Sequence, residues 1–424
     1  MRKRRNGLVC PIALLFVIVG VIHGMAQNGP RWVATWSAAA QATAPLDSGF
    51  APPFGAGFSY QTIRNIVHSS IAGTAVRVRI TNTFGLQPVT FKAAYLGLAE
   101  AGATLVSGSN HALTFGGSVS VTIPAGAEAW SDPLPFDVPS DENLAVSLFA
   151  ENATGTPTIH VGSMQTIYVA DGNFAGSEDG SPFTATDVTW YFVDGVDVLA
   201  SPRVKGAVVA VGDSITNGNS STPDANNRWP NYLARRLLAG PPGLELSVLD
   251  QAIVGNRVLN DSPCFGESAV SRIERDVLGQ TGVQYLILLE GGADIGFPNL
   301  GFTFLCLDPN PEVSANQVIA AYEQIIAKAH AKGVKVLGGT LTPFKGAFFG
   351  WTPELEAKRQ AVNAFIKTSR AFDGFIDFAT AVADSGDPTT LAPQFNSGDN
   401  LHPNDAGYQA MANAIDLSLF LPKR

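Results

Sequence analysis

The fold is decided by residues 207–218, which read AVVAVGDSITNG. The first five residues are all apolar, as in a parallel strand that is buried on both faces. Gly212 and Gly218 flank the polar segment and allow the backbone to turn sharply there. We therefore expect a buried strand that ends in a tight turn carrying Ser214. This turn would lie at the edge where parallel sheets bind their ligands.

Downstream of this stretch, strand-like segments alternate with helical segments. Strands are expected at residues 244–249, 285–289, 334–337 and 375–378, and helices at residues 229–238, 268–278, 313–332, 354–371 and 405–417. Such alternation is typical of a parallel sheet covered by helices on both faces. It predicts a three-layer α/β/α sandwich in a domain formed by residues 201–424.

Upstream, the sequence has the rhythm of β-structure. Residues 76–81 alternate valine or isoleucine with arginine or threonine, and similar alternation occurs at residues 119–123 and 144–148. Segments rich in Gly, Pro, Asp and Asn separate these runs, and no long amphipathic helix is expected among them. Residues 27–200 therefore form, by prediction, an all-β sandwich domain that is jelly-roll-like.

The first 26 residues have the pattern of a secretory signal peptide. A basic start at residues 2–5 is followed by an apolar run at residues 8–22 and by the small residues Gly24 and Ala26. An uncleaved membrane anchor is the alternative, but the run is shorter than the roughly 20 apolar residues of a spanning helix. We expect cleavage after Ala26, a secreted or periplasmic protein, and no membrane attachment after cleavage.

Charge and cysteine content narrow the classes of partner. The formal charge is −9, and it becomes −13 when residues 1–26, with four basic and no acidic residues, are removed. An acidic protein of this kind is not expected to bind nucleic acid. Two cysteines remain, Cys264 and Cys306, which form either one disulfide of an exported protein or two buried thiols.

A histidine near the C-terminus supplies a candidate base for Ser214. Residues 398–408 read GDNLHPNDAGY, so that Asp399 lies three residues before His402. A carboxylate can orient an imidazole while the other ring nitrogen accepts a serine proton. Asn404 is a suitable N-cap for the closing helix. The remaining histidines lie in the leader (His23), in the β half (His68, His111 and His160) or near a helix end (His330).

These segments together resemble the GDSL family of serine esterases, also called SGNH hydrolases. The family's first block matches Gly212-Asp213-Ser214, and its last block, a D-x-x-H pair, matches Asp399 and His402. Its second block, a glycine after the second strand, matches Gly255. The resemblance covers residues 205–420 in the family's order. Residues 32–36 and 61–64 also resemble the β domain of a bacterial two-domain branch of this family.

The resemblance implies roles for the matched residues. Ser214 would be the nucleophile, His402 the base and then the acid, and Asp399 the residue that orients the imidazole. The backbone N–H groups of Ser214 and Gly255 would form an oxyanion hole. The family fold is the same three-layer sandwich, and no metal or organic cofactor is implied. The sequence also has no Cys, His and carboxylate cluster with the spacing of metal ligands.

At the position of the family's third block, this sequence departs from the family pattern. Where the family has an asparagine whose amide is a third oxyanion donor, this sequence has Ala293, which has no side-chain donor. One interpretation is that the third donor is missing. The other is that a backbone N–H near Gly291 and Gly292, or the amide of Asn256, replaces it.

Taken together, the sequence predicts a secreted serine esterase that forms an acyl-serine intermediate. Its substrates would be small-molecule or polysaccharide esters, with short acyl or acetyl groups on carbohydrate or plant-derived compounds. Long-chain lipids are disfavoured, because the sequence has no evident apolar lid. The alternative function is a carbohydrate-binding or adhesive protein on a degenerate esterase scaffold, for which Ala293 is the supporting feature.

Overall fold

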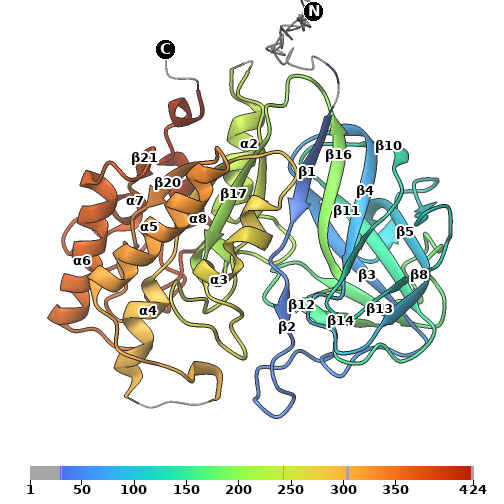
Figure 1. The fold of residues 1–424 in the computed structure, drawn as a ribbon, viewed down its shortest axis with the longest axis horizontal. Helices are drawn as coiled ribbons and strands as arrows, with labels where there is room; N and C mark the ends of the chain where they lie inside the picture. The colour runs from blue at the N-terminus through green and yellow to red at the C-terminus, as the bar shows by residue number, and fades with distance from the viewer. Residues whose placement is uncertain (1–28, 30, 242, 302–304, 422–424) are drawn as a thin grey trace, which may run out of the picture.

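The structure is a computed structural model, in which residues 29, 31–241, 243–301 and 305–421 are described. The predicted signal peptide, residues 1–26, lies outside the described residues. Figure 1 shows an all-β part, formed by residues 31–200, beside an α/β part that begins at residue 207. The change of architecture falls between Ala200, the end of the β part, and Ala207.

The β part consists of antiparallel sheets. One contains, in order, β1 (Arg31–Ser37), β16 (Val193–Ala200), β4 (Gly73–Thr81) and β10 (Leu134–Val138), with β9 (Glu128–Trp130) beside β4. The second contains β14 (Ala185–Asp187), β13 (Ile167–Asp171), β3 (Gln61–Ser69), β11 (Glu142–Ala150), β5 (Val89–Ala101) and β6 (Thr104–Leu105), with β7 (His111–Ala112) and β8 (Val121–Ile123) beside β5. A short third sheet contains β15 (Trp190–Tyr191), β12 (Thr158–His160) and β2 (Gln41–Ala42). The first strand, β1, pairs antiparallel with the last, β16.

The predicted alternation holds in part of one strand, since Arg79 and Thr81 of β4 are also buried, and it fails in another. In β4, Val76, Val78 and Ile80 are fully buried and face the core. In β11, both faces are buried, and Ala145 is as inaccessible as its apolar neighbours. Ala145 lies in a small separate cluster with Ile66 and Leu105, away from the main core. Burial on two faces removes the contrast on which the alternation argument depends. The strand expected at 119–123 is also shorter, β8.

The α/β part contains one parallel sheet. Its order is β18 (Ser247–Asp250), β17 (Ala207–Gly212), β19 (Val283–Leu289), β20 (Lys335–Gly339) and β21 (Gly374–Ile376). All four strand pairs are parallel. The first strand of the sheet in chain order, β17, lies between the second and the third, so the winding direction reverses there. Ligands of doubly wound sheets bind at this reversal, beyond the carboxyl ends of the strands.

Two groups of helices cover the sheet, as the three-layer prediction requires. One group is α2 (Trp229–Leu238), α7 (Phe378–Val382) and α8 (Asp405–Asn413); the other is α3 (Ala269–Ile273), α5 (Ala315–Ala331) and α6 (Pro353–Thr368). Two short helices, α1 (Ser214–Asn217) and α4 (Gly292–Gly296), follow directly after strands. No helix in the described part of the chain is long and apolar enough to cross a membrane.

Several predicted boundaries need correction. The helix expected at 268–278 is α-helical only to Ile273 and continues as a π-helical turn, Glu274–Leu278. The helices expected to reach residues 371 and 417 end at Thr368 and Asn413. The strand expected at 375–378 stops at Ile376, because Asp377 accepts a hydrogen bond from the Thr380 N–H and so begins α7.

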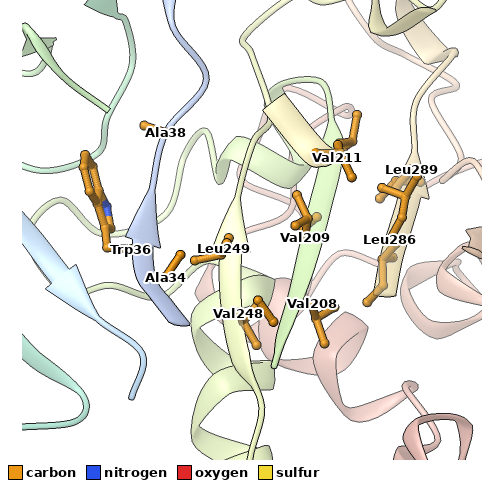
Figure 2. Packing of buried hydrophobic residues seen from close by; sticks show 14 of the residues in the cluster. Ala34, Trp36, Ala38, Val208, Val209, Val211, Val248, Leu249, Leu286 and Leu289 are labelled. Atoms are coloured by element: carbon orange, nitrogen blue, oxygen red, sulfur yellow. The ribbon is translucent and has the colours of Figure 1, made fainter. Parts of the chain in front are cut away.

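The two parts share one hydrophobic core. Figure 2 shows Ala34 of β1 pointing toward Leu249 of β18, next to the buried strand β17, with Trp36 on the opposite side of β1. Ser247 Oγ donates a hydrogen bond to the Ala34 carbonyl at 2.5 Å, and the Ala34 N–H donates to the carbonyl of Thr281 at 3.0 Å. The β part is therefore packed against the edge of the parallel sheet, and the position of one affects the other.

Candidate active site

Ser214 lies at the point where β17 turns into α1. Asp213 caps this helix by accepting a hydrogen bond from the Ile215 N–H at 2.9 Å, and Gly218 ends it in a left-handed conformation at φ 86°. A Cβ atom on Gly212 would lie 2.5 Å from the Leu289 carbonyl oxygen, so only glycine fits before the turn. The predicted turn is thus confirmed, and it leaves Ser214 9% exposed.

Ser214, His402 and Asp399 form a continuous hydrogen-bonded chain. Ser214 Oγ lies 2.7 Å from His402 Nε2, and His402 Nδ1 lies 2.6 Å from a carboxylate oxygen of Asp399. The other carboxylate oxygen accepts hydrogen bonds from the N–H groups of Leu401 at 2.9 Å and His402 at 2.8 Å. The structure therefore brings together the three residues that the sequence selected.

The environment of Asp399 favours its ionised form. Partial burial raises the pKa of this carboxyl, but the hydrogen bonds from the His402 ring and from the two backbone N–H groups outweigh it. The pKa of Asp399 lies well below its usual range as a result. A carboxylate that stays ionised can hold the imidazole in one tautomer and stabilise the imidazolium.

The loop that carries His402 is fixed from both sides. Asn404 caps α8 by accepting a hydrogen bond from the Gly407 N–H at 3.0 Å, as predicted. Before the loop, Asn396 Oδ1 accepts hydrogen bonds from the N–H groups of Gly398 and Asn400. His330, the other histidine of the α/β part, is instead paired with Asp373 at 2.8 Å on an exposed surface.

The candidate oxyanion residues line one cavity together with the nucleophile. Gly255 adopts φ 71°, and a Cβ atom there would lie 2.8 Å from the ring of Phe265. Ala293 lies in α4, is 7% exposed and lines the same cavity as Ser214 and Gly255. The family asparagine is therefore replaced at a position that faces the site.

Asn256 is not the replacement for that asparagine. Its amide nitrogen donates hydrogen bonds to the carbonyl oxygens of Phe265 at 2.8 Å and Glu267 at 2.9 Å, and its amide oxygen accepts from Arg272. Both ends of this amide are thus committed to the neighbouring loop. The interpretation in which Asn256 supplies a third donor is wrong.

Three buried carboxyl groups surround the nucleophile turn. Asp213, Glu290 and Asp294 are at most 7% exposed. Burial raises the pKa of Asp213 and of Asp294 to about 6, and it raises the pKa of Glu290 well above its usual range. Asp294 accepts hydrogen bonds from the N–H groups of Val258 and Leu259, whereas both carboxyl oxygens of Glu290 lack a partner among the described residues.

The cavity beside Ser214 has a volume of about 240 Å³ and mainly apolar walls. Phenylalanines at positions 265, 297, 344, 348 and 349 line it, and Asn219 and Thr342 are polar side chains at its surface outside the hydrogen-bonded chain. Sequence reasoning missed all of these residues. One signal was present: residues 344–350, which read FKGAFFG, follow a buried strand at the sheet edge where ligands bind.

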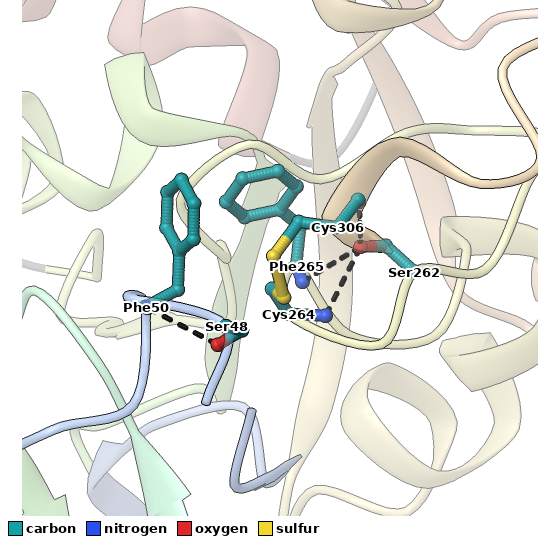
Figure 3. The surroundings of a disulfide bond; sticks show 6 residues. All are labelled: Ser48, Phe50, Ser262, Cys264, Phe265 and Cys306. Atoms are coloured by element: carbon teal, nitrogen blue, oxygen red, sulfur yellow. Dashed lines mark hydrogen bonds between the residues drawn. A yellow bond between two sulfur atoms is a disulfide. The ribbon is translucent and has the colours of Figure 1, made fainter. Parts of the chain in front are cut away.

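One wall of this cavity is tied down by a disulfide. Cys264 and Cys306 are bonded, which decides between the two alternatives left open by the sequence. Figure 3 shows Phe265 next to this bond and Ser262 beside it. Ser262 Oγ accepts hydrogen bonds from the N–H groups of Cys264 and Phe265 and donates to the Cys306 carbonyl. Among the residues that the structure describes, no cluster of His, Cys, Asp and Glu could hold a metal ion.

Part of the chain is similar to known proteins. The sequence model of the GDSL-like lipase/acylhydrolase family matches residues 210–410, which include every candidate site residue. Similar solved structures include an acetylxylan esterase from Geobacillus stearothermophilus, with 20% identity over 49% of this chain and 91% of that chain, at a TM-score of 0.37. A GDSL-like lipase from Bacteroides thetaiotaomicron is 17% identical over 51% of this chain and 87% of that chain, at a TM-score of 0.35. No curated protein sequence matches the chain.

Proposed function

Because residues 210–410 form a GDSL-like lipase/acylhydrolase domain, we propose that this carboxylic ester hydrolase is a serine esterase acting through Ser214, His402 and Asp399. The observation that carries the proposal is the hydrogen-bonded chain from Ser214 Oγ through the His402 ring to Asp399, with separations of 2.7 and 2.6 Å. A serine hydroxyl is a weak nucleophile, and an oriented base at this distance is what activates it.

The reaction proceeds in two stages. Ser214 Oγ attacks the ester carbonyl carbon while His402 Nε2 takes the hydroxyl proton. The N–H groups of Ser214 and Gly255 stabilise the negative oxygen of the tetrahedral intermediate. The bond to the alcohol oxygen then breaks as His402 returns the proton to that oxygen, leaving an acyl-serine. In the second stage water, deprotonated by His402, attacks the acyl carbon. The bond to Ser214 Oγ then breaks as His402 returns the proton to that oxygen, which releases the carboxylic acid and restores Ser214.

For the substrate, we propose an ester with a short acyl group, acetyl or somewhat larger, on a carbohydrate or plant-derived alcohol. The leader-like residues 1–26 and the acidic composition support a secreted or periplasmic enzyme without a nucleic-acid partner. The β part contributes ordered surface next to the site, since Gly162 accepts a hydrogen bond from Asn217 of α1 at 2.6 Å.

A carbohydrate-binding protein on a degenerate esterase scaffold is the second candidate. Ala293 favours it, because one family donor is absent. The complete chain from Ser214 to Asp399 argues against it, since binding alone requires no activated serine.

Labelling with a fluorophosphonate probe tests the proposed function. The probe should label the wild-type protein and the control variant Ser107→Ala, which alters an exposed serine of the β part. It should not label Ser214→Ala, whose kcat on p-nitrophenyl acetate should fall by roughly 10⁴–10⁶. A Ser214→Ala variant that keeps more than about a tenth of wild-type activity would exclude this nucleophile. Absence of labelling in the wild-type protein would favour the binding protein.

A further inference from the structure

The cavity beside Ser214 is walled mainly by apolar side chains, five of them phenylalanines, with few polar groups. Phe344, Phe349 and Phe297 are 2%, 4% and 7% exposed, respectively, and form its inner wall. Phe348 also lines the cavity but is 66% exposed, so it lies where the cavity meets solvent. Phe344, Phe348 and Phe349 all lie in the loop that follows β20.

These rings form a connected set of edge contacts. The ring of Phe349 lies 5.3 Å from Phe344 and 5.2 Å from Phe348, in T-shaped arrangements that aromatic pairs prefer. A Cβ atom at Gly296 would lie 2.7 Å from the Phe349 ring, so the glycine allows this ring to pack against α4. The inner wall is thus held in place before any ligand binds.

A second part of the cavity wall, at Phe265, is held by covalent and interdomain contacts. Phe265 follows Cys264, which is bonded to Cys306, and its ring lies over Gly255. Phe50 of the β part approaches the Phe265 ring edge-on at 5.5 Å, as Figure 3 shows. Phe265 also contacts Phe297, with ring centroids 6.0 Å apart, so this part of the wall is continuous with the other phenylalanines of the cavity.

We propose that this cavity binds the acyl group of the substrate and selects an apolar acyl group larger than acetyl, up to about the size of hexanoyl or benzoyl. The proposal rests on the proposed function. An apolar cavity of about 150 Å³ is large enough for benzene, and this cavity measures about 240 Å³. Acetyl would leave most of the aromatic surface uncovered.

The alcohol is the less suitable occupant of the same cavity. The hydroxyl groups of a carbohydrate would lose their hydration against phenylalanine rings, and burial of unpaired hydroxyl groups is unfavourable. The leaving oxygen must also receive its proton from His402. The alcohol must therefore lie beside His402 Nε2, which is 2.7 Å from Ser214 Oγ.

Two isomeric esters test whether the cavity of the wild-type protein binds the acyl side or the alcohol side of the substrate. Ethyl hexanoate and hexyl acetate have the same composition and similar hydrophobicity, but the apolar chain lies on the acyl side in one and on the alcohol side in the other. We expect kcat/KM to be at least about tenfold higher for ethyl hexanoate, since each buried methylene contributes up to about fourfold. Equal values, or a preference for hexyl acetate, would overturn the proposal.

A series of esters with acyl groups of increasing length, measured on one variant and its control, tests whether the phenylalanines that line the cavity set the acyl selectivity. On p-nitrophenyl esters, kcat/KM should rise from acetate to hexanoate by at least about tenfold. Phe348→Ser, at an exposed position where folding is not at risk, should lower kcat/KM for hexanoate about fivefold or more and for acetate less than about twofold. Phe375→Ser, at a 44% exposed phenylalanine of β21 outside the cavity, should change neither value.

The outcomes of these experiments distinguish a failure of this inference from a failure of the proposed function. If Ser214→Ala abolishes hydrolysis of every ester but the wild-type profile is flat, the esterase assignment stands and the acyl selectivity is excluded. If Phe348→Ser and Phe375→Ser change hexanoate hydrolysis equally, the cavity is not the acyl site.

Discussion

His160 of the β part lies with its Nε2 atom 2.9 Å from Oδ1 of Asn217, the last residue of the helix that Ser214 begins. The Asn217 amide nitrogen donates a second hydrogen bond to the β part, at the Gly162 carbonyl. Arg228 Nε donates to the Asn217 backbone carbonyl at 3.1 Å. The β part therefore contacts the nucleophile turn directly, and not only the edge of the sheet.

This contact predicts that replacing His160 impairs catalysis without removing a catalytic group. His160→Leu leaves a buried acceptor on Asn217 unpaired, which costs about 1–3 kcal/mol of stability. Because α1 carries Ser214, we expect kcat to fall several-fold while KM changes less. Urea unfolding and steady-state kinetics measure the two effects. His111→Leu, at an exposed histidine of β7, is the matched control. A His160→Leu variant as active and as stable as this control would show that the contact does not position the helix.

The orienting role of Asp399 leads to a second prediction. Asp399→Asn keeps the size of the side chain but favours the wrong imidazole tautomer, and kcat should fall by up to about 10⁴. His402→Ala should be similarly severe. His330→Ala should leave kcat unchanged, because His330 pairs with Asp373 on the surface. Steady-state kinetics on one activated aryl ester compares the three variants. Loss of activity in His330→Ala but not in His402→Ala would identify a different base.

The buried carboxyl of Glu290 leads to a third prediction, which concerns how the free energy of unfolding depends on pH. Burial raises the pKa of this carboxyl well above its usual range, and the nearby Asp213 and Asp294 add to the effect. Because its pKa is higher in the folded than in the unfolded protein, this carboxyl contributes its full stabilisation at pH values below the unfolded-state pKa. The contribution is lost as the pH rises toward the folded-state pKa. The wild-type protein should therefore lose stability from about pH 4.5 upward, by at most about 1.4 kcal/mol per pH unit for this group.

Glu290→Gln tests this pH dependence, since glutamine has a similar shape and no charge. Relative to the wild-type protein, the variant should gain at least about 1 kcal/mol of unfolding free energy between pH 5.5 and pH 8.5. Urea unfolding at the two pH values measures the change. Glu323→Gln, at an exposed glutamate of α5, is the control and should follow the wild-type protein. If both variants keep the wild-type slope, Glu290 is not the group responsible.

The sequence was sufficient to predict the elements whose signal is local. Residues 207–211 are apolar without interruption because β17 is covered on both faces, and this pattern cannot be mistaken for a surface strand. The spacing of Asp399 and His402 lets one short loop present a carboxylate to its own histidine. Both features depend on residues that are close in the sequence, and both were confirmed in outline.

The features that the sequence did not reveal depend on contacts between distant segments. The acyl cavity combines Phe265, Phe297 and Phe349, which are separated by dozens of residues and meet only because their loops lie at one edge of the sheet. The burial of both faces of β11 likewise depends on Ile66 and Leu105 from other strands. The contact of His160 with Asn217 depends on how the two parts pack, for which a single sequence contains no signal.

Ala293 leads to the last prediction, which concerns the oxyanion hole. Preorganised donors stabilise the negative oxygen of the transition state, and the loss of one such donor typically costs about 10²–10³ in kcat. The structure excludes the Asn256 amide as the substitute, because its nitrogen donates to Phe265 and Glu267. The missing donor and a backbone N–H in the turn at Gly291 and Gly292 are the two accounts that remain.

Ala293→Asn distinguishes these two accounts, because the Ala293 methyl faces a cavity of about 240 Å³ that has room for an amide. If the donor is missing, kcat should rise about tenfold or more while KM changes less, since the new hydrogen bond forms only in the transition state. Ala293→Leu adds a side chain of similar size without a donor, so it reports crowding alone and should lower kcat. Steady-state kinetics of the wild-type protein and both variants on p-nitrophenyl acetate provides the measurement. A kcat for Ala293→Asn that is unchanged or lower than that of the wild-type protein would favour the backbone donor, because the added amide would then compete with a hole that is already complete.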